Sequence, residues 1–277
     1  MIYELRFMSK ALLIVTAIII SAITDNWWRR LLRQFDVSHF LEYPARFLRN
    51  SEHKLNREKY TPSELQLRGT LFVIIAIVGS LLGGWLFSLI FSHWIFTLLL
   101  LVICLPIGSN FSKADSIKKN LQVSNLPAAR AQLQGTVFRH YAVMDAPSLA
   151  RATAEYLAIE FMEKIIAPIF WFLLLGVAGL FAAITTSLLH QTIARASNKS
   201  PAFGITARNA YFFVNYIPSR LTVFLCVIAS LFLPTGNWRE VIEKTSPEML
   251  KSPPVYLTLL CAASCLNLSL GGRISGY

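Results

Sequence analysis

Six apolar segments constrain the fold of this chain more than any other feature. They cover residues 11–24, 70–91, 94–107, 165–189, 221–233 and 255–270. A helix needs about 20 apolar residues to cross a bilayer, so the shorter segments require tilt or burial inside a bundle. Only 15% of the 277 residues are charged, which is too little polar surface for a soluble protein of this size. We therefore expect an all-α fold, a polytopic membrane helical bundle with about five to six spans.

The first apolar segment has two interpretations. Arg6 and Lys10 followed by an apolar run are typical of a secretory signal peptide. No small-residue cleavage site follows this run, and the chain continues into Asp25, Asn26 and two tryptophans. We therefore expect a retained membrane span.

Basic residues are concentrated in two polar stretches, residues 25–68 and 109–164. The chain carries 26 Lys and Arg against 15 Asp and Glu, a net charge of +11. The second and third apolar segments form a predicted tight hairpin, so both stretches lie on one side, which the positive-inside rule makes cytoplasmic. In a membrane protein such charge indicates topology and anionic lipid, not nucleic acid. We expect a single membrane domain over residues 1–277, with cytoplasmic insertions at 25–68 and 109–164.

Residues 190–220 conflict with this topology. Simple alternation of spans places them outside, yet this stretch carries four basic residues and no acid, namely Arg195, Lys199, Arg208 and Arg220. Either the fourth apolar segment is re-entrant or broken, with Gly176 and Gly179 as the candidate positions, or these residues depart from the positive-inside rule.

The second insertion has the clearer helical pattern. Residues 114–123 and 127–137 are predicted as amphipathic helices joined by a turn at 124–126. Asp145 and Pro147 predict the start of a third helix, because proline is tolerated in the first helical turn.

Three weaker signals concern helix ends and packing. Pro44 predicts a helix break, and residues 61–64 predict the start of a short helix. Gly79 and Gly83 form a small-xxx-small pattern, from which we expect close packing against another helix.

The strongest candidates for chemistry are three acids that precede the fourth apolar segment. Glu155, Glu160 and Glu163 lie at the mouth of a span, where a carboxylate is costly unless it faces water, a partner or a ligand. The spacing of Glu160 and Lys164 predicts a surface ion pair. Apolar neighbours predict partial burial of Glu155. Near Arg139 this acid would hold a cationic ligand or act as a base, or else it would be a solvated or structurally paired carboxylate.

A second candidate group lies at the entrance of the fifth segment. Asn215, Pro218 and Arg220 precede the apolar run. An arginine there is equally suited to snorkelling as an anchor and to clamping a phosphate through its guanidinium.

No metal site is expected. The five histidines are scattered, and P-loop, H-E-x-x-H and G-x-S-x-G motifs are missing from the sequence. All four cysteines lie in apolar segments, and we expect buried free thiols: Cys104, Cys226, Cys261 and Cys265.

Five segments, in order, resemble the CobD/CbiB family of adenosylcobinamide-phosphate synthases. They read NLPAAR, VFRHY, RATAEYLAIEFMEKIIAPIFW, NYIPSRLT, and SP followed by LGG, at residues 125–130, 137–141, 151–171, 215–222, and 252–253 with 270–272. The resemblance implies a multi-pass bacterial inner-membrane protein of cobalamin biosynthesis. It also implies an ATP-dependent amide ligation of an aminopropanol, or its phosphate, to adenosylcobyric acid.

The chain departs from this family at positions that carry acids, amides or a histidine. By the resemblance, a histidine becomes Tyr43, an aspartate becomes His140, a Glu-Asn pair becomes Ile159 and Glu160, and an asparagine becomes Pro254. Near residues 187–192 the family's NTLDSM stretch reads SLLHQT, and an acidic pair becomes Tyr211 and Phe212. Few carboxylates remain to hold the metal that balances phosphate charge in such a ligation.

We therefore expect a diverged, non-catalytic member with a binding, sensing or scaffold role. The chain is also similar to AmpE, a smaller membrane protein of the same outline. The alternative is a working synthase or related ligase that uses Glu155, Glu160 and Glu163 with Arg139 and Arg220. Mg and ATP would be cofactors only in that case. A transporter is a third, weaker hypothesis. Expected partners are the lipid bilayer, anionic lipid and other membrane proteins.

Overall fold

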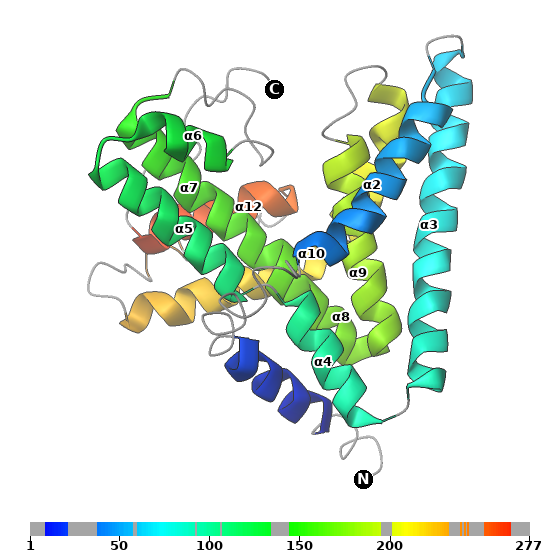
Figure 1. Cartoon of the computed structure of the whole chain (residues 1–277), viewed down its shortest axis with the longest axis horizontal. Helices are drawn as coiled ribbons and strands as arrows, with labels where there is room; N and C mark the ends of the chain where they lie inside the picture. Colours follow the sequence, from blue (N-terminus) through cyan, green and yellow to red (C-terminus); the bar gives the residue numbers. More distant parts are fainter. Residues whose placement is uncertain are drawn as a thin grey trace. The chain divides into compact units, whose positions relative to one another are not determined.

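The structure is a computed structural model that describes residues 9–21, 38–57, 60–91, 93–105, 107–133, 144–194, 201–232, 239, 241, 243 and 252–266. These residues are mostly helical, and no strand occurs among them (Figure 1). Three helical stretches are long and apolar enough to cross a membrane: Pro62–Ile90, Val177–Ala194 and Pro201–Phe232. Shorter apolar helices cover Ser9–Ser21, Trp94–Cys104 and Pro254–Leu266. The predicted all-α membrane fold is confirmed.

The chain divides into two compact units. The first unit comprises Met1–Pro106 and Ala167–Asn215, and the second comprises Ile107–Ile166 and Tyr216–Tyr277. The predicted single domain with two cytoplasmic insertions stays a prediction.

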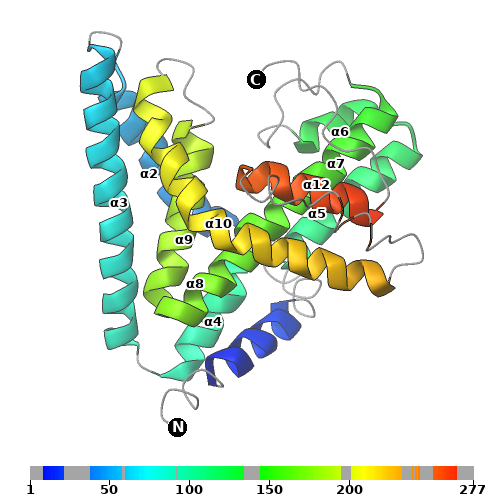
Figure 2. The ribbon, with the colours of Figure 1, turned by 180° about the vertical axis from the view of Figure 1, so that it is seen from behind.

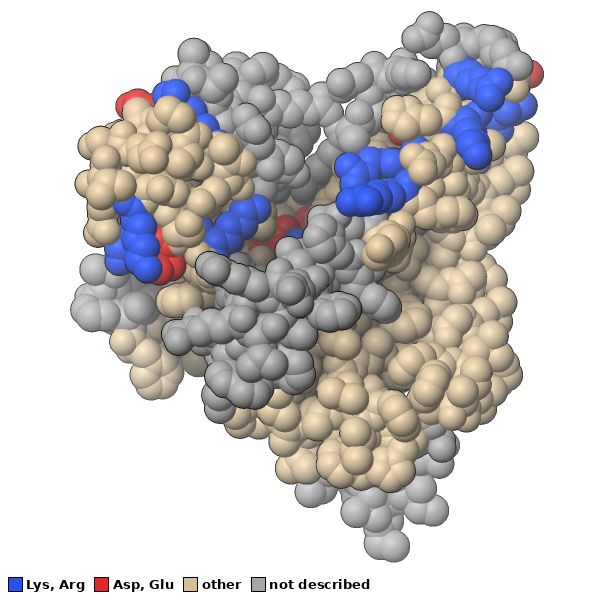
Figure 3. Space-filling model, viewed as in Figure 1, with Lys and Arg blue, Asp and Glu red and all other residues tan. Residues whose placement is uncertain are grey.

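Helix α3 (Pro62–Ile90) is the longest helix confined to the first unit, and it packs along α9 (Val177–Leu189), as Figures 1 and 2 show from opposite sides. Helix α2 (Ser38–Leu55) packs on α3, on α9 and on the π-helix η3 (His190–Ala194). Leu48, Val73 and Phe203 share the buried core of these elements. Figure 3 shows Lys and Arg gathered over α2 and the beginning of α3, whereas the rest of α3 in this view is uncharged.

The fourth apolar segment is broken at Gly176, as one sequence alternative expected. Gly176 has φ 68° and ψ −146°, and it separates α8 (Ala167–Leu175) from α9. The two helices pack on each other as a hairpin (Figure 1). Gly179 is not a break, because it lies inside α9. The fourth apolar segment is therefore not one continuous helix.

Substituting Gly176 with alanine tests this turn. Its backbone conformation is one that only glycine adopts readily, and we expect the variant to lose about 1–3 kcal/mol of stability. The nearest atom to an added Cβ is Lys10 Nζ at 4.0 Å, so the loss comes from backbone strain and not from a clash. The measurement is the melting temperature of the detergent-purified protein. Gly83→Ala is the control, since an added Cβ there meets nothing within 4 Å.

Two expectations for the first unit were wrong. Pro44 lies inside α2 and does not end it. A proline in the body of a helix removes one backbone hydrogen bond, and the buried side chains of Ala45 and Leu48 hold the helix in place despite that loss.

The second wrong expectation concerns the glycines of α3. An added Cβ at Gly79 or Gly83 would meet nothing within 4 Å, so this pair makes no close helix contact. The close contacts are at Gly69, where a Cβ would lie 2.2 Å from Phe203 O, and at Gly84, where it would lie 2.6 Å from Ala178 Cα. The partner helices approach a different face of α3 from the one that the pattern indicated.

The residues predicted to start a short helix instead start α3, which is 29 residues long. Thr61 caps it in a reciprocal capping box. Glu64 N donates to Thr61 Oγ1 at 3.4 Å, and Thr61 N donates to Glu64 Oε2 at 3.0 Å.

The second unit contains the predicted amphipathic helices. They are α5 (Ile107–Gln122), α6 (Leu126–Leu133) and α7 (Ala146–Phe161), and the last of these continues into the π-helix η2 (Met162–Ile166). Ser124, with φ 56°, makes the expected turn between α5 and α6. Asp145 caps α7 by accepting from Ser148 N at 3.1 Å, which confirms the predicted helix start. The predicted part of α6 beyond residue 133 lies outside the described residues.

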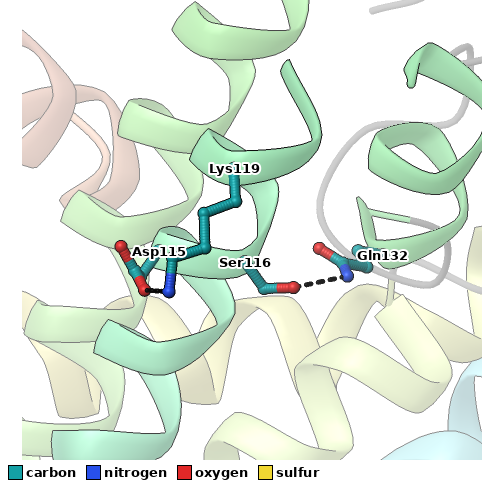
Figure 4. Close-up of polar contacts among 4 residues, drawn as sticks. All are labelled: Asp115, Ser116, Lys119 and Gln132. Atoms are coloured by element: carbon teal, nitrogen blue, oxygen red, sulfur yellow. Dashed lines mark hydrogen bonds and ion pairs between the residues drawn. The ribbon is translucent and has the colours of Figure 1, made fainter. Parts of the chain in front are cut away.

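Helix α5 is tied to its neighbour by side chains drawn in Figure 4. Gln132 Nε2 of α6 donates to Ser116 Oγ of α5 at 2.8 Å, and Asp115 pairs with Lys119 at 2.7 Å within α5. Helix α12 (Pro254–Leu266) packs on α7 in the same unit. These contacts place α7, which carries the candidate acids, between α5 and other helices of its unit.

Candidate functional site

The three candidate acids lie on α7 and η2 and are all buried. Glu155 is 5% exposed, Glu160 is 4% exposed and Glu163 is 1% exposed. The predicted burial of Glu155 is confirmed. Glu155 and Glu160 lie about 140° apart around α7, the first beside the buried Ile159 and the second on the side of the buried Leu149. Burial of this kind demands that each acid be paired, hydrogen-bonded or protonated.

Two lysines belong to the same cluster. Lys164 Nζ pairs with Glu160 Oε2, as the spacing predicted, but the pair is buried on its acidic side and is not a surface pair. Lys113 of α5 lies with its Nζ 3.4 Å from the Tyr156 hydroxyl and 4.6 Å from the centre of that ring. Glu160, Glu163, Lys113 and Lys164 lie close enough for their charges to interact, and we name these four residues the carboxylate cluster. The cluster joins α5, α7 and η2.

Burial shifts the acid–base equilibria of this cluster toward neutral forms. It raises the pKa of Glu160, and the charge of Lys164 opposes that rise. It lowers the pKa of Lys113, and the negative charge of Glu160 opposes that fall. A carboxyl with a raised pKa beside an amine with a lowered pKa is an arrangement that can accept, donate or share a proton.

The π-helix η2 carries Glu163 and Lys164. Its five residues, Met162–Ile166, follow α7 directly along the chain. Single π-turns within α-helices are frequent at functional sites. Nothing in the sequence pattern predicts this turn, and we found no signal that could have indicated it.

His190 and Tyr211 form a buried aromatic pair in the first unit. The rings of His190, in η3, and Tyr211, in α10 (Pro201–Phe232), are stacked with centres 3.7 Å apart and planes at 16°. By the resemblance described above, both positions carry acids in the CobD/CbiB family. The structure brings them into direct contact, which sequence reasoning had not anticipated.

Asn215 lies one turn after Tyr211 on α10 and is fully buried. Its Nδ2 donates to Tyr211 O at 3.0 Å, whereas its Oδ1 is buried without a hydrogen-bond partner in the described residues. A buried amide oxygen in this state is able to accept a hydrogen bond from a ligand or a water.

The two candidate arginines differ in what the structure shows. The Arg220 guanidinium lies 3.6 Å above the Tyr216 ring and donates to Tyr216 O and Ser219 Oγ, both at 2.9 Å. These three contacts are all with residues of its own helix. Arg139 lies outside the described residues.

Candidate metal ligands were also compared in space. Among the described residues, no group of three or more His, Cys, Asp or Glu side chains is arranged to hold a metal ion. The four cysteines are free thiols, and Cys265 Sγ lies 3.5 Å from Cys226 O.

These observations define an all-helical membrane protein with a buried carboxylate–lysine cluster and, separately, a buried His–Tyr stack. The family model described as CobD/Cbib protein matches residues 14–275, so this chain belongs to the CobD/CbiB family.

Curated relatives agree with the family. The chain is 25% identical over 247 residues to a cobalamin biosynthesis protein CobD of Brucella suis biovar 1, covering 85% of this chain and 75% of that protein. It is 26% identical over 209 residues to a protein of the same name from Chromobacterium violaceum, covering 75% and 66% respectively. A CobD of Dehalococcoides mccartyi is 28% identical over 175 residues, covering 62% and 56%. No solved structure matches the chain.

Proposed function

We propose that this chain is a diverged, non-catalytic member of the CobD/CbiB family with a binding, sensing or scaffold role in the membrane. The observation that carries the proposal is the stack of His190 on Tyr211. By the family resemblance, these two positions hold acids in other members. In this chain they hold two aromatic rings that pack on each other. Carboxylates are the ligands on which a magnesium–nucleotide site depends, and stacked rings do not replace them.

The remaining acids support the same proposal. Glu160 is paired with Lys164, and Lys113 lies close enough to influence both charges. The protein's own lysines therefore offset much of the negative charge that would otherwise attract a metal. Such a cluster suits recognition of an amine or amide group, which can exchange for the internal contacts. The proposed binding, sensing or scaffold role is AmpE-like.

The alternative is that the chain retains amide ligase activity. The buried acids support this alternative. A carboxyl with a raised pKa, such as Glu160, is suited to act as a base toward an amine. Glu155 and Glu163 would then bind the amine, and Arg139 and Arg220 the phosphate. The described side chains do not fit a magnesium–nucleotide site, because the His–Tyr stack takes the place of two acids and Glu160 is already paired.

We further propose a multi-pass position in the bacterial inner membrane. The apolar helices α3, α9 and α10 support contact with a lipid bilayer. Basic residues concentrated in the first insertion favour a cytoplasmic face that meets anionic lipid, and other membrane proteins are the remaining candidate partners.

Complementation tests the proposed loss of catalysis. In a strain that lacks its own synthase and is supplied with cobyric acid, we expect expression of this chain not to restore growth. Supplying cobinamide, which lies beyond the ligation, should restore growth and so serves as the control. An active family member expressed in the same strain serves as the positive control. An epitope tag on both proteins checks that their levels in the membrane are equal.

Restored growth that Glu155→Ala abolishes would overturn the non-catalytic proposal and favour the ligase. A second readout uses the purified protein with adenosylcobyric acid, aminopropanol, Mg and ATP. We expect binding of the corrinoid in equilibrium dialysis without any amide product. Amide product formed at a rate that depends on Glu155 would equally favour the ligase.

A further inference from the structure

The outward face of α2 combines exposed aromatic and basic side chains. Tyr43 is 71% exposed and Phe47 is 69% exposed, and they lie one helical turn apart. The exposed basic side chains of the same helix follow them: Arg46, Arg49, His53 and Lys54. We name these six residues the basic face of α2.

Helical geometry separates this face cleanly from the buried one. At 100° per residue, the basic face spans about 160° of the helix, and Ala45, Leu48 and Glu52 occupy the opposite side. The acid Glu52 is buried, and its Oε1 accepts from Asn56 Nδ2 at 3.0 Å.

The neighbouring helix α3 indicates the level at which α2 lies. Its charged residues are Glu64 and Arg68, and the following stretch to Ile90 is uncharged over about 33 Å, close to the thickness of a hydrocarbon core. The Arg68 guanidinium lies 3.5 Å above the Tyr60 ring, a pairing suited to the headgroup region.

Core packing places Leu48, in the middle of α2, near the same depth. Leu48 shares a buried cluster with Val73, which follows Arg68 by about 7 Å along α3. Amphipathic helices that lie in a membrane interface are buried by a similar distance, about 5–10 Å. Figure 3 shows the Lys and Arg of α2 and the beginning of α3 together at this end of the unit.

We propose that the basic face of α2 binds the headgroups of anionic phospholipids, with Tyr43 and Phe47 inserted at the boundary between headgroups and acyl chains. Arg46 and Lys54 are separated by about 12 Å along the helix, which suits several lipid phosphates better than one soluble phosphate. The aromatic pair favours lipid over an acidic protein segment, because both rings would otherwise stay in water. The inference rests on the membrane position proposed above and not on the loss of catalysis.

Lipid binding by the full-length protein tests the proposal. The detergent-purified protein is titrated with phosphatidylglycerol and, separately, with phosphatidylcholine, and bound lipid is counted by native mass spectrometry. We expect a clear preference for phosphatidylglycerol. Because each cation near an anionic surface contributes about fivefold, Arg49→Gln with Lys54→Gln should lower that affinity on the order of 25-fold.

A matched variant removes the same charge elsewhere. Lys118→Gln with Lys119→Gln changes two exposed lysines of α5 and should leave the lipid affinity within about twofold of wild type. Tyr43→Ser with Phe47→Ser should weaken binding of both lipids. Unchanged elution in size-exclusion chromatography and an unchanged helical circular dichroism spectrum show that each variant is folded.

Three outcomes would overturn the proposal. One is equal binding of the two lipids by the wild type. Another is an equal loss in the α2 and α5 variants. The third is displacement of phosphatidylglycerol by millimolar inorganic phosphate at constant ionic strength, which would indicate a soluble phosphate ligand instead.

Discussion

Replacing Gly179 with alanine is expected to destabilise the protein by about 3 kcal/mol, because the added methyl group overpacks the contact between α8 and α9. The added Cβ would lie 2.2 Å from Trp171 O, 2.9 Å from Trp171 C and 2.8 Å from Leu175 Cβ. Two of these are backbone atoms of α8, which cannot move without shifting the whole helix. Trp171 is also held at its other end, because its Nε1 donates to Val214 O at 3.0 Å.

The measurement is thermal melting followed by fluorescence-detected size-exclusion chromatography. Gly79→Ala is the matched control, since it adds the same methyl group inside α3 where nothing lies within 4 Å. We expect that control to be neutral or to gain up to about 1 kcal/mol, because alanine favours a helix over glycine. A Gly179→Ala protein that melts with the wild type would contradict the close hairpin.

Glycine also shows where prediction from the sequence stops. The pattern of Gly79 and Gly83 is a genuine signal for close packing, but a helix's own sequence does not reveal which face meets a partner. The contacts fall instead on Gly69 and Gly84. For Gly176 the position of the break could be anticipated, because a glycine in a long apolar run allows a turn that other residues resist.

Helix boundaries were predictable where the signal is local. Asp145 starts α7 and Thr61 starts α3, since each cap is made by residues within one turn. The prediction that Pro44 breaks a helix was wrong, because the effect of a proline is local. The buried residues that hold α2 together belong to a tertiary core, which the local sequence does not reveal.

The candidate site was predictable in part for the same reason. The Glu160–Lys164 pair follows from a spacing of four, and the burial of Glu155 follows from its apolar neighbours. Lys113 comes from a different helix, so its place beside Tyr156 depends on the packing of α5 on α7. The contact of His190 with Tyr211 likewise depends on how η3 meets α10.

Removing the cation of the buried pair is the second change with a large expected effect. Lys164→Met should destabilise the protein by about 3 kcal/mol near neutral pH, because it leaves the Glu160 carboxylate buried without its ion-pair partner. The side chain of Lys164 is itself 32% exposed, which puts the loss at the lower end of the range for buried pairs. Adding Glu160→Gln to this variant should recover most of the loss, since the amide needs no counter-charge.

The dependence on pH separates this explanation from simple loss of packing. Burial raises the pKa of Glu160 above its ordinary value of 4.5. The folded state therefore holds a proton that the unfolded chain releases, so the stability from the protonated acid is present at low pH and is lost as pH rises through the raised pKa. Melting temperatures between pH 5 and pH 8 should show Lys164→Met falling further below wild type as pH rises, while the double variant follows the wild type or shows less dependence. A loss that is the same at every pH, or that Glu160→Gln does not relieve, would mean that Lys164 contributes through packing of its aliphatic stem and not through its charge.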